Sequence, residues 1–478
     1  MSKQLETMEI RTLGERRGNP RLWIDGDQAM RGGFAPGVEF NPKVDKERCM
    51  LTLEVVTSGG ERVVSKKIVR DREIPVIDIN NSDLLGMFVK LGLTAVRIVV
   101  KYHRIFILPI ASELRAMERL ERLKAKLDAG EPLLIGSFSA GIGILDRAAH
   151  EGLQAAGVAS RLAVANEIRA DCMAHAVERN PVYDAKTILL TAPMQEVVFD
   201  SWLMSQLPKL DGIVIGIPCS GASSAGRSKL KLTHPEDHPD VGHLVVPFLA
   251  AVAQTSPAFV VIECVPNWLK TASASISRSM LRDLGYVVHE TVLNAADFNM
   301  IEHRQRMAMV AVTNPLSFDF DMVEVPVPQE HCFAEIMDEV PLDDKSWSRL
   351  DYLKDKMIRD EAAGKGFRMC VVDGTATKLP TLNKTLAKRQ STGTFIQHPV
   401  DPDLLRIPTV AEHGRAKGIW TEMVEGTTQT FGHEVCGQAI SVPPWIAVFK
   451  AIGKTLISFK ESATLTFSSF VRPELKAA

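Results

Sequence analysis

Two reactive side chains, Cys219 and Glu263, each follow a short apolar run that predicts a β-strand. Cys219 stands in Gly-Ile-Pro-Cys-Ser-Gly directly after residues 212–216, and Glu263 follows residues 259–262. Ligands bind at the carboxyl ends of parallel strands, where the N–H groups of a following helix or loop favour a thiolate. A cysteine and a carboxyl group at neighbouring strand ends suit nucleophilic attack with protonation of a ring nitrogen. The alternative for Cys219 is a buried structural cysteine.

A second pattern predicts a nucleotide-like cofactor. The Gly-rich turn Ser139-Ala140-Gly141-Ile142-Gly143 follows the apolar run 133–137 and precedes a helical run. Glycines at such a turn let a ligand approach the backbone closely. Glu167 follows the next expected strand, where an acid accepts hydrogen bonds from ribose hydroxyls. These residues indicate an adenosine-containing cofactor, and the alternative is a structural turn with an unrelated surface acid.

The elements that must position these residues change character along the chain. Residues 1–110 hold short β-like runs separated by Gly, Asn and Asp, which predicts a mostly-β module. A connecting helix is expected over 111–130, with Ser112 as its N-cap. Residues 131–313 alternate strands and helices, as in a parallel sheet of βαβ units. Its expected strands cover residues 133–137, 163–166, 187–190, 212–216, 259–262, 286–292 and 307–312, the last two as a hairpin. Residues 314–405 lose this alternation and read as an irregular insertion, which leaves 406–478 as a C-terminal part.

The composition is that of a globular protein, with 45% hydrophobic and 24% charged residues. A net charge of -2 gives no overall attraction to nucleic acid, so DNA binding would need local basic patches. The seven cysteines form no CxxC pair or metal-ligand cluster, so neither a disulfide framework nor a metal site is expected. No apolar run is long enough for a bilayer, and a cytoplasmic protein without membrane contact is expected.

The order of these motifs resembles the DNA (cytosine-5) methyltransferase family over roughly residues 133–456. The resemblance rests on the Gly-rich turn, Pro218-Cys219, Glu263-x-Val265, Arg304-x-Arg306 and Gly437-x-Ala439. Residues 406–412, Arg-x-x-Thr-x-x-Glu, are similar to a late helix start of the family. The resemblance implies a Rossmann-like AdoMet-dependent methyltransferase domain (131–313), an inserted target-recognition domain (314–405) and a C-terminal part (406–478) that returns to the catalytic domain.

The resemblance also implies a role for each motif. Cys219 would attack carbon 6 of a flipped cytosine, Glu263 would protonate ring nitrogen 3, and Arg304 and Arg306 would hold the base and phosphate. S-adenosyl-L-methionine (AdoMet) would contact Phe138, Ser139, Ala140, Gly141, Ile142, Gly143, Glu167, Ile168, Pro218, Gln438 and Ala439. Double-stranded DNA would contact Ser220, Arg227, Lys229, Thr381, Leu382 and Lys384.

Several positions depart from the family pattern. Cys264 and Gln438 each replace an Asn, Glu302 replaces a Gln, and Ser139 stands where a Phe is usual, with Phe138 beside it. Two alternatives therefore stay open, a catalytically weakened DNA-binding homologue and cytosine methylation in RNA. The retained Cys219, Glu263, Arg304 and Arg306 favour a DNA-modifying enzyme. Restriction-modification is the expected setting, although this chain shows no partner nuclease, and the N-terminal module is a candidate for DNA or protein contacts.

Overall fold

A computed structural model describes residues 7–365 and 368–462 of the chain. The chain divides into two compact units, an N-terminal one ending at Arg122 and a larger one from Leu123 to Ser462. Helix α3 (Ala111–Ala129) spans the boundary, as expected for a connecting helix over 111–130. It begins at Ala111, so Ser112 lies in its first turn and the expectation of Ser112 as the N-cap was wrong.

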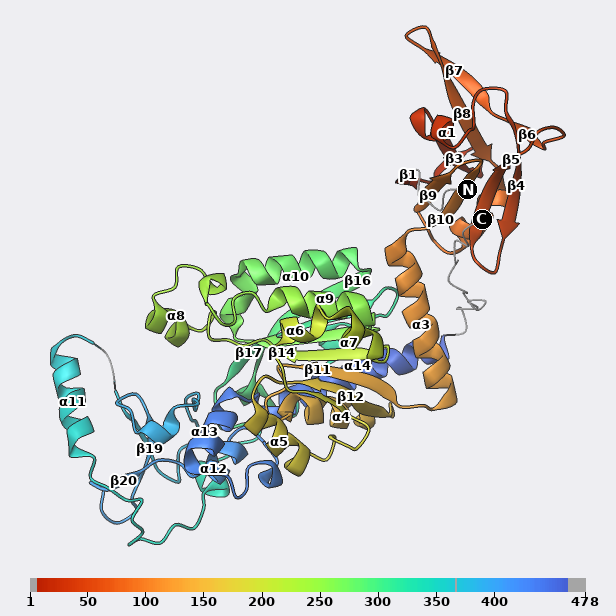
Figure 1. The fold of residues 1–478 in the computed structure, drawn as a ribbon. Helices are drawn as coiled ribbons and strands as arrows, with labels where there is room; N and C mark the ends of the chain where they lie inside the picture. The colour runs from red at the N-terminus through yellow and green to blue at the C-terminus, as the bar shows by residue number, and fades with distance from the viewer. Residues whose placement is uncertain (1–6, 366–367, 463–478) are drawn as a thin grey trace. The chain divides into compact units, whose positions relative to one another are not determined.

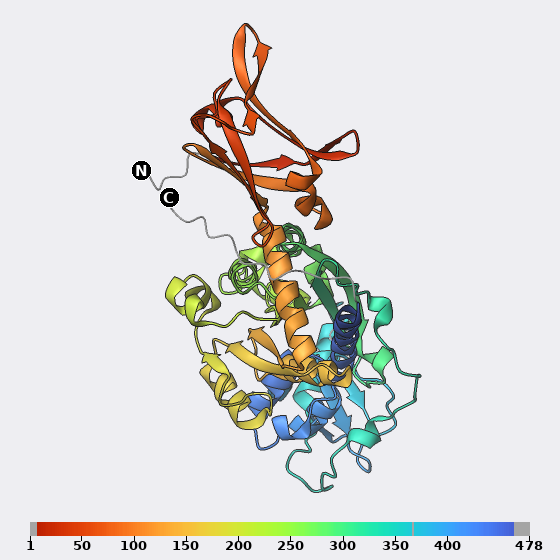
Figure 2. The same cartoon turned by 90° about the vertical axis from the view of Figure 1, so that its right-hand side faces the viewer.

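The N-terminal unit is built from two antiparallel sheets. In the six-stranded sheet the order is β1 (Thr7–Thr12), β9 (Ala95–Lys101), β10 (Arg104–Pro109), β5 (Met50–Val55), β4 (Glu39–Asp45) and β6 (Arg62–Val63). In the four-stranded sheet the order is β2 (Gly14–Arg16), β3 (Asn19–Asp25), β8 (Arg72–Asn80) and β7 (Ser65–Val69). Strands β7 and β8 form a hairpin that extends beyond the rest of this unit (Figures 1 and 2).

This unit has an apolar core of its own. Leu22 and Ile24 of β3, Ile77 and Ile79 of β8, and aliphatic residues of β5, β9 and β10 form one buried cluster. In β3 the buried Leu22 and Ile24 alternate with exposed or half-buried neighbours, as expected for a strand that buries one face, whereas β10 is buried along most of its length. The sequence did not indicate the two short helices α1 (Asp27–Arg31) and α2 (Ser82–Lys90). Helix α2 begins at an Asn81 cap, whose side chain accepts from the backbone N–H groups of Asp83 and Leu84.

The larger unit is organised around a seven-stranded sheet. Its order is β13 (Ile188–Leu190), β12 (Ser160–Asn166), β11 (Leu133–Phe138), β14 (Gly212–Gly216), β15 (Phe259–Cys264), β17 (Gln305–Thr313) and β16 (Tyr286–Asn294). The first five strands are parallel, and β17 runs antiparallel to both of its neighbours. The seven strands expected from the sequence and the terminal hairpin are all present.

Helices cover both faces of this sheet (Figure 1). Helices α6 (Met194–Val198), α9 (Val245–Thr255) and α10 (Ala272–Asp283) lie on one face, where Phe248 and Val252 join the main apolar core. Helix α4 (Ile144–Ala155) lies on the other face and packs along α14 (Val442–Glu461). Helices α5 (Ala170–Arg179), α7 (Ser201–Gln206) and α8 (Ser224–Leu230) complete the strand connections.

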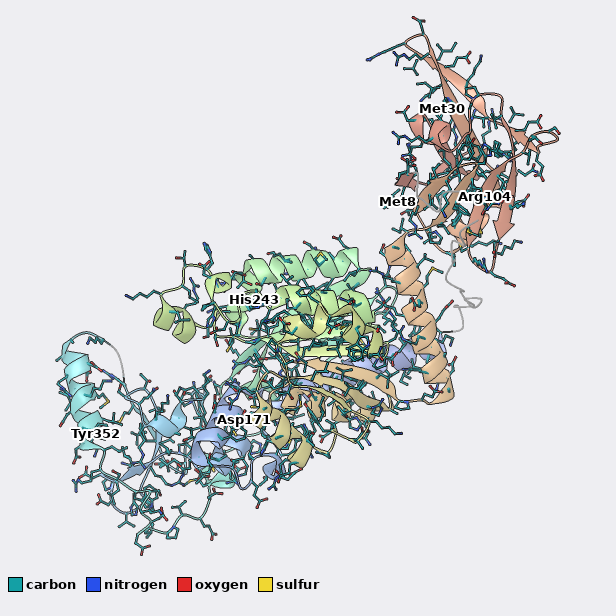
Figure 3. The ribbon with its side chains drawn as sticks, in the orientation of Figure 1. Met8, Met30, Arg104, Asp171, His243 and Tyr352 are labelled. Carbon is teal, nitrogen blue, oxygen red and sulfur yellow. The ribbon has the colours of Figure 1, made fainter. Side chains whose placement is uncertain are left out.

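The segment expected to be irregular contains few regular elements. Its strands are β18 (Cys370–Val372), β19 (Thr394–Gln397) and β20 (Leu405–Arg406), and its α-helix is α11 (Asp351–Ala362). Tyr352 lies on α11, which projects from this segment (Figure 3). A small apolar cluster that includes Phe333, Leu379 and Leu382 stabilises the remainder. No pattern in the sequence indicated α11.

The chain then returns to the sheet through helices α12 (Val410–Arg415), α13 (Gln429–Gln438) and α14. Thr409 and Glu412 form a capping box at the start of α12, and Arg406 makes a buried bidentate ion pair with Glu412, with both N···O distances 2.7 Å. The Arg-x-x-Thr-x-x-Glu motif is therefore a helix start, as its resemblance implied. Over the described ranges no single helix is long and apolar enough to cross a membrane, although α13 and α14 pass that test as a bent pair.

Candidate active site

The two residues expected to be reactive lie at the ends of adjacent parallel strands. Gly216 of β14 is the register partner of Glu263 of β15, and the N–H of Ile217 donates to the carbonyl of Glu263 at 2.9 Å. Cys219 follows within three residues of β14 and is partly exposed. Its carbonyl accepts from the N–H groups of Ala222 and Ser223, which form a tight turn after the nucleophile. The structure therefore brings these two candidates to one edge of the sheet.

Glu263 is buried and paired with Arg306 of the next strand. Nε of Arg306 lies 3.0 Å from Oε1 of Glu263. Burial raises the pKa of the Glu263 carboxyl, and the cations of Arg306 and Arg304 oppose this shift. A carboxyl group with a raised pKa keeps its proton to higher pH, as a general acid requires.

Cys264, which replaces the family's usual Asn, has a structural contact in this chain. Its thiol donates to the carbonyl of Ile217, with 3.4 Å between sulfur and oxygen. Burial raises the pKa of this thiol, so the side chain stays a neutral donor. Cys264 thus helps to fix the backbone that leads to Cys219.

Arg304 lies behind the reaction centre. It is 2% exposed, and its Nη2 donates to the carbonyls of Gly437 at 3.0 Å and Ala439 at 2.6 Å. Burial lowers the pKa of its guanidinium to about 10. Nη2 of Arg304 is therefore engaged at the end of α13, and the expectation that Arg304 holds base and phosphate stays a prediction. Arg306 is the arginine placed at Glu263.

The Gly-rich turn has the backbone geometry that a cofactor site needs. Ser139, Gly141 and Gly143 have φ values of 53°, 59° and 76°. The N–H of Gly141 donates to Glu167 at 2.8 Å, and the other carboxylate oxygen of Glu167 accepts from the N–H of Arg169 at 2.9 Å. A Cβ added to Gly141 would meet nothing within 4 Å, so the turn is open on that side. Ile168 is 64% exposed and offers an apolar surface beside Glu167.

A buried polar network beneath this turn was not found by sequence reasoning. Asp146, in the first turn of α4, accepts from the hydroxyl of Ser137 at 2.6 Å and of Tyr183 at 2.8 Å. Asn180 donates to the carbonyl of Gly143 at 2.8 Å. Burial raises the pKa of Asp146 to about 6. The acid three residues after Gly143 was the visible sign, whereas Tyr183 and Asn180 carried none.

The other residues expected at the cofactor differ in their accessibility. Phe138 is 0% exposed and packs edge-on against Phe248, with ring centroids 6.5 Å apart. The ring of Phe138 is therefore part of the apolar core, and a contact of this residue with AdoMet stays a prediction. Ala140 and Ile142 belong to the turn itself, and Pro218, Gln438 and Ala439 have partly or fully exposed side chains. Their cofactor contacts stay predictions.

The residues expected to bind DNA fall into two groups. Ser220 and Arg227 lie in the segment after Cys219, where Arg227 is exposed and donates to the carbonyl of Thr233 at 3.1 Å. The side chain of Lys229 lies outside the described part of the structure. Thr381, Leu382 and Lys384 lie far along the chain, in the segment after β18.

In that second group the side chains point in different directions. Thr381 and Lys384 are exposed and available to a ligand. Leu382 is 1% exposed and packs with Leu379 in an apolar cluster. This burial gives the side chain of Leu382 an anchoring role, and a contact of this residue with DNA stays a prediction.

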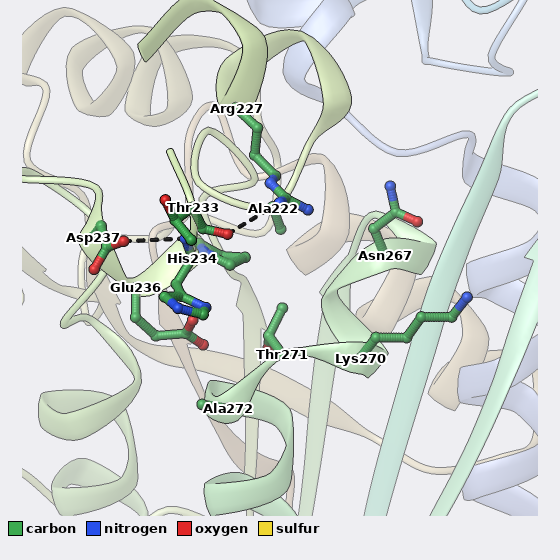
Figure 4. A pocket seen from close by; sticks show the side chains of 11 residues that line it. Ala222, Arg227, Thr233, His234, Glu236, Asp237, Asn267, Lys270, Thr271 and Ala272 are labelled. Carbon is green, nitrogen blue, oxygen red and sulfur yellow. Dashed lines mark hydrogen bonds between the residues drawn. The ribbon is translucent and has the colours of Figure 1, made fainter. Parts of the chain in front are cut away.

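A cavity of about 540 Å³ opens beside the reaction centre. Arg227 contributes to it from α8, and Asn267, Lys270 and Thr271 contribute from the segment after β15 (Figure 4). Cys219 and Glu263 do not line it, and Ala222, three residues after Cys219, is its lining residue nearest to them in the sequence. Within residues 7–365 and 368–462, no cluster of three or more His, Cys, Asp or Glu side chains could hold a metal ion.

The fold and the site together define a class of protein. The sheet has five parallel strands, an antiparallel β17 between β15 and β16, and a Gly-rich turn after β11. This arrangement is a Rossmann-like methyltransferase fold. The solved structure of the S. pombe Dnmt2 methyltransferase aligns with a TM-score of 0.51 and 17% identity, over 68% of this chain and 97% of that one. The structure of the Entamoeba histolytica methyltransferase EhMeth aligns with a TM-score of 0.51 and 14% identity, over 69% of this chain and 98% of that one.

The sequence comparisons identify the family. Residues 135–454 match the profile of the C-5 cytosine-specific DNA methylase family, and the chain belongs to this family. A similar relative is the Type II methyltransferase M.BspRI of Lysinibacillus sphaericus, which is 26% identical over 34% of this chain and 38% of its own length. Another is the Type II methyltransferase M.SsoII of Shigella sonnei, which is 24% identical over 54% of this chain and 66% of its own length. This chain thus spans between about a third and two thirds of the length of these relatives.

Proposed function

We propose that this protein transfers a methyl group from AdoMet to carbon 5 of cytosine in double-stranded DNA. The observation that carries the proposal is the placement of Cys219 and Glu263 at adjacent strand ends, with Arg306 bound to Glu263 at 3.0 Å. The family and its Type II relatives support a DNA substrate with a defined target sequence.

In the proposed reaction Cys219 is the nucleophile. Its thiolate adds to carbon 6 of the cytosine ring, and the electrons of the 5,6 double bond become available at carbon 5. Glu263 donates its proton to ring nitrogen 3 and thereby stabilises the adduct, while Arg306 orients the carboxyl group. Once carbon 5 carries the methyl group, a base from the solvent removes the proton of carbon 5, the 5,6 double bond re-forms and the thiolate of Cys219 leaves. Ring nitrogen 3 returns its proton to Glu263, which restores the ring and the acid. Because carbon 6 is covered in a stacked duplex, the base must leave the helix first.

The residues around the Gly-rich turn fit AdoMet. The open space at Gly141 leaves room for the cofactor, Glu167 can accept from the ribose hydroxyls, and Ile168 can cover one face of the adenine. When bound, AdoMet supplies the electrophilic methyl group. The turn and Cys219 follow neighbouring strands, because β11 and β14 pair in register with Phe138 opposite Ile215.

Covalent trapping on DNA that contains 5-fluorocytosine tests the proposal. Fluorine at carbon 5 cannot leave as a proton, so the wild-type protein with AdoMet is expected to form a stable protein–DNA complex. Cys219→Ala should form none, and Glu263→Gln should trap at least about 100-fold more slowly, as is typical for loss of a general acid. Equal trapping by wild type and Cys219→Ala would reject the proposal.

Two further arms separate the remaining alternatives. An RNA duplex with the same sequence and 5-fluorocytosine is expected not to trap, and preferential trapping there would assign RNA as the substrate. A DNA-binding homologue without catalysis would bind the duplex in a gel shift but form no covalent complex. Bisulfite sequencing of DNA from expressing cells then identifies the target sequence.

A further inference from the structure

A buried ion pair lies behind the segment expected to read DNA. Glu302 precedes β17, and Lys417 follows α12. Both side chains are 0% exposed, and Nζ of Lys417 donates to Oε1 of Glu302. Burial lowers the pKa of Lys417 to about 7, and Glu302 opposes this shift. A buried pair of this kind is costly to break from either side, because the remaining charge has no solvent.

Both partners also hold the backbone of one residue, Leu382. The carboxylate of Glu302 accepts from the N–H of Leu382 at 2.7 Å, and Nζ of Lys417 donates to its carbonyl at 3.2 Å. The two charged groups thus satisfy both backbone polar groups of a residue that is itself buried. We name residues 379–384 the recognition loop, and the Glu302–Lys417 pair the clamp.

The recognition loop is also tied to the segment that contains Glu302. The N–H of Leu379 donates to the carbonyl of Ile301 at 2.8 Å, and the N–H of His303 donates to the carbonyl of Leu379 at 2.9 Å. The hydroxyl of Thr381 donates to the carbonyl of His303 at 2.9 Å. The loop therefore follows any movement of residues 301–303.

Close packing against α13 limits the loop on another side. A Cβ added to Gly437 would lie 2.1 Å from the backbone N and 2.3 Å from the Cα of Lys384. Only glycine allows this approach, so the loop has little freedom to move toward α13.

The segment that carries Glu302 leads directly to the reaction centre. Arg304 lies 3.8 Å from Glu302 and binds the carbonyls at the end of α13, and Arg306 reaches Glu263 two residues later. One short stretch of backbone thus supports the recognition loop at its start and the carboxyl group of the reaction centre at its end.

We propose that the Glu302–Lys417 clamp sets the position of the recognition loop relative to the reaction centre and thereby determines which DNA sequence is methylated. Glu302 and Lys417 act as positioning residues, since both are fully buried and neither can touch DNA. Thr381 and Lys384, exposed on the loop, would contact the bases or the backbone that the clamp places them against. The inference rests on the proposed function and adds the origin of its sequence selectivity.

Three variants test the clamp on the full-length protein. Glu302→Gln leaves the buried charge of Lys417 without its partner, and Lys417→Met leaves Glu302 with only the more distant Arg304 at 3.8 Å. The double variant removes both charges of the clamp. Each single variant is expected to lower the melting temperature, and the double variant should recover most of this loss. The double variant should still lack selectivity, because a methionine side chain offers no donor to the carbonyl of Leu382. Arg349→Gln, which removes an exposed ion pair with Asp403 in the same segment, is the matched control.

Selectivity is measured as the ratio of kcat/KM on the target duplex to kcat/KM on duplexes with one neighbouring base pair changed. This ratio should fall at least about tenfold in the double variant, as expected when a base contact is misplaced. The affinity of the double variant for AdoMet should stay within about threefold of the wild-type value. A folded double variant with wild-type selectivity would overturn the clamp. Failure of the wild type to trap on 5-fluorocytosine DNA would instead reject the proposed function, so the two failures are distinguishable.

Discussion

At the scale of single residues, the proton on Glu263 governs the proposed reaction. Burial raises the pKa of this carboxyl group, and the cation of Arg306, 3.0 Å away, opposes this rise without cancelling it. The protonated form is the one that donates to ring nitrogen 3. The rate should therefore decline as pH rises through the pKa of Glu263.

Arg306→Gln tests this assignment. Removing the cation raises the pKa of Glu263 further, so the alkaline decline of kcat should move to higher pH. The maximal rate should fall about tenfold or more, because the carboxyl group loses its orienting partner. The measurement is kcat against pH at saturating DNA and AdoMet. The control is Arg278→Gln, which breaks an ion pair with Glu290 in the same unit and should leave the pH profile of kcat unchanged. An unchanged pH profile in Arg306→Gln would contradict the assignment.

Asp146 gives a second prediction at this scale, which concerns stability. Its pKa is raised from 3.8 to about 6 by burial, so the folded state binds the proton more tightly than the unfolded state. The stability that comes from this proton is fully present below about pH 4 and is lost as pH rises to about 6. Two pKa units correspond to about 3 kcal/mol. The free energy of unfolding of the wild type should fall by about this amount relative to Asp146→Asn over that range.

Urea unfolding of both proteins at a series of pH values measures this difference. Asn at this position keeps an acceptor for Ser137 and places an amide toward Tyr183, so the fold should tolerate it. Asp283→Asn, an exposed acid at the end of α10, is the control and should give a constant offset from the wild type. A constant offset for Asp146→Asn would show that Asp146 does not change its protonation in this range.

At the scale of elements, the contact between α4 and α14 depends on a glycine. A Cβ at Gly152 would lie 2.5 Å from the carbonyl oxygen of Ile446 and 2.6 Å from Cβ of Phe449. Gly152→Ala must push α14 away from α4, and we expect a loss of about 1–3 kcal/mol in the free energy of unfolding, as for overpacked cores. Thermal or urea unfolding of the larger unit measures it.

The same substitution at Gly86 is a useful comparison. Gly86 also lies inside a helix, α2, but a Cβ there would meet nothing within 4 Å. Alanine loses less backbone entropy than glycine, so Gly86→Ala should stabilise the N-terminal unit by up to about 1 kcal/mol. If both alanine variants were stabilised, the close approach of α14 would not limit the packing.

The strands around the reaction centre could be predicted because their sequences are simple. Residues 212–216 and 259–262 are continuous apolar runs, as buried parallel strands require. Strand β14 ends at Gly216 as expected, whereas β15 continues through Glu263 to Cys264. Helix α11 was missed, because its apolar positions are interrupted by Lys, Asp and Arg and only Leu353 among them is buried. Helices α1 and α2 are too short to show a clear period.

For the candidate site, the motif residues could be predicted but their surroundings could not. Cys219, Glu263 and Gly141 carry local signals in the residues beside them. Lys417 pairs with Glu302 across 115 positions of sequence, and nothing near either residue indicates the partner. The burial of the Phe138 and Leu382 side chains could not be predicted for a related reason, because burial is decided by distant packing partners such as Phe248.

At the scale of the whole molecule, the chain combines two units that each have a core. The N-terminal cluster, which includes Leu22, Ile77 and Ile98, lies entirely within its own unit, and the larger unit has a separate core around Phe248. The S. pombe Dnmt2 methyltransferase is covered over 97% of its length by only 68% of this chain. The methyltransferase fold is therefore complete in that structure without a counterpart for the remaining third.

This organisation predicts that the two units fold independently. A fragment of residues 111–478, which keeps α3, should melt cooperatively, bind AdoMet and trap 5-fluorocytosine DNA within about threefold of the full-length rate, since domains with their own cores fold as units. A fragment of residues 1–110 should show the circular dichroism of a β protein and its own unfolding transition.

Duplex binding by the full-length protein and the 111–478 fragment, measured over a range of salt concentrations, then isolates the contribution of the N-terminal unit. A smaller salt dependence in the fragment would assign phosphate contacts to that unit, whereas an insoluble or inactive 111–478 fragment would show that the larger unit needs it to fold.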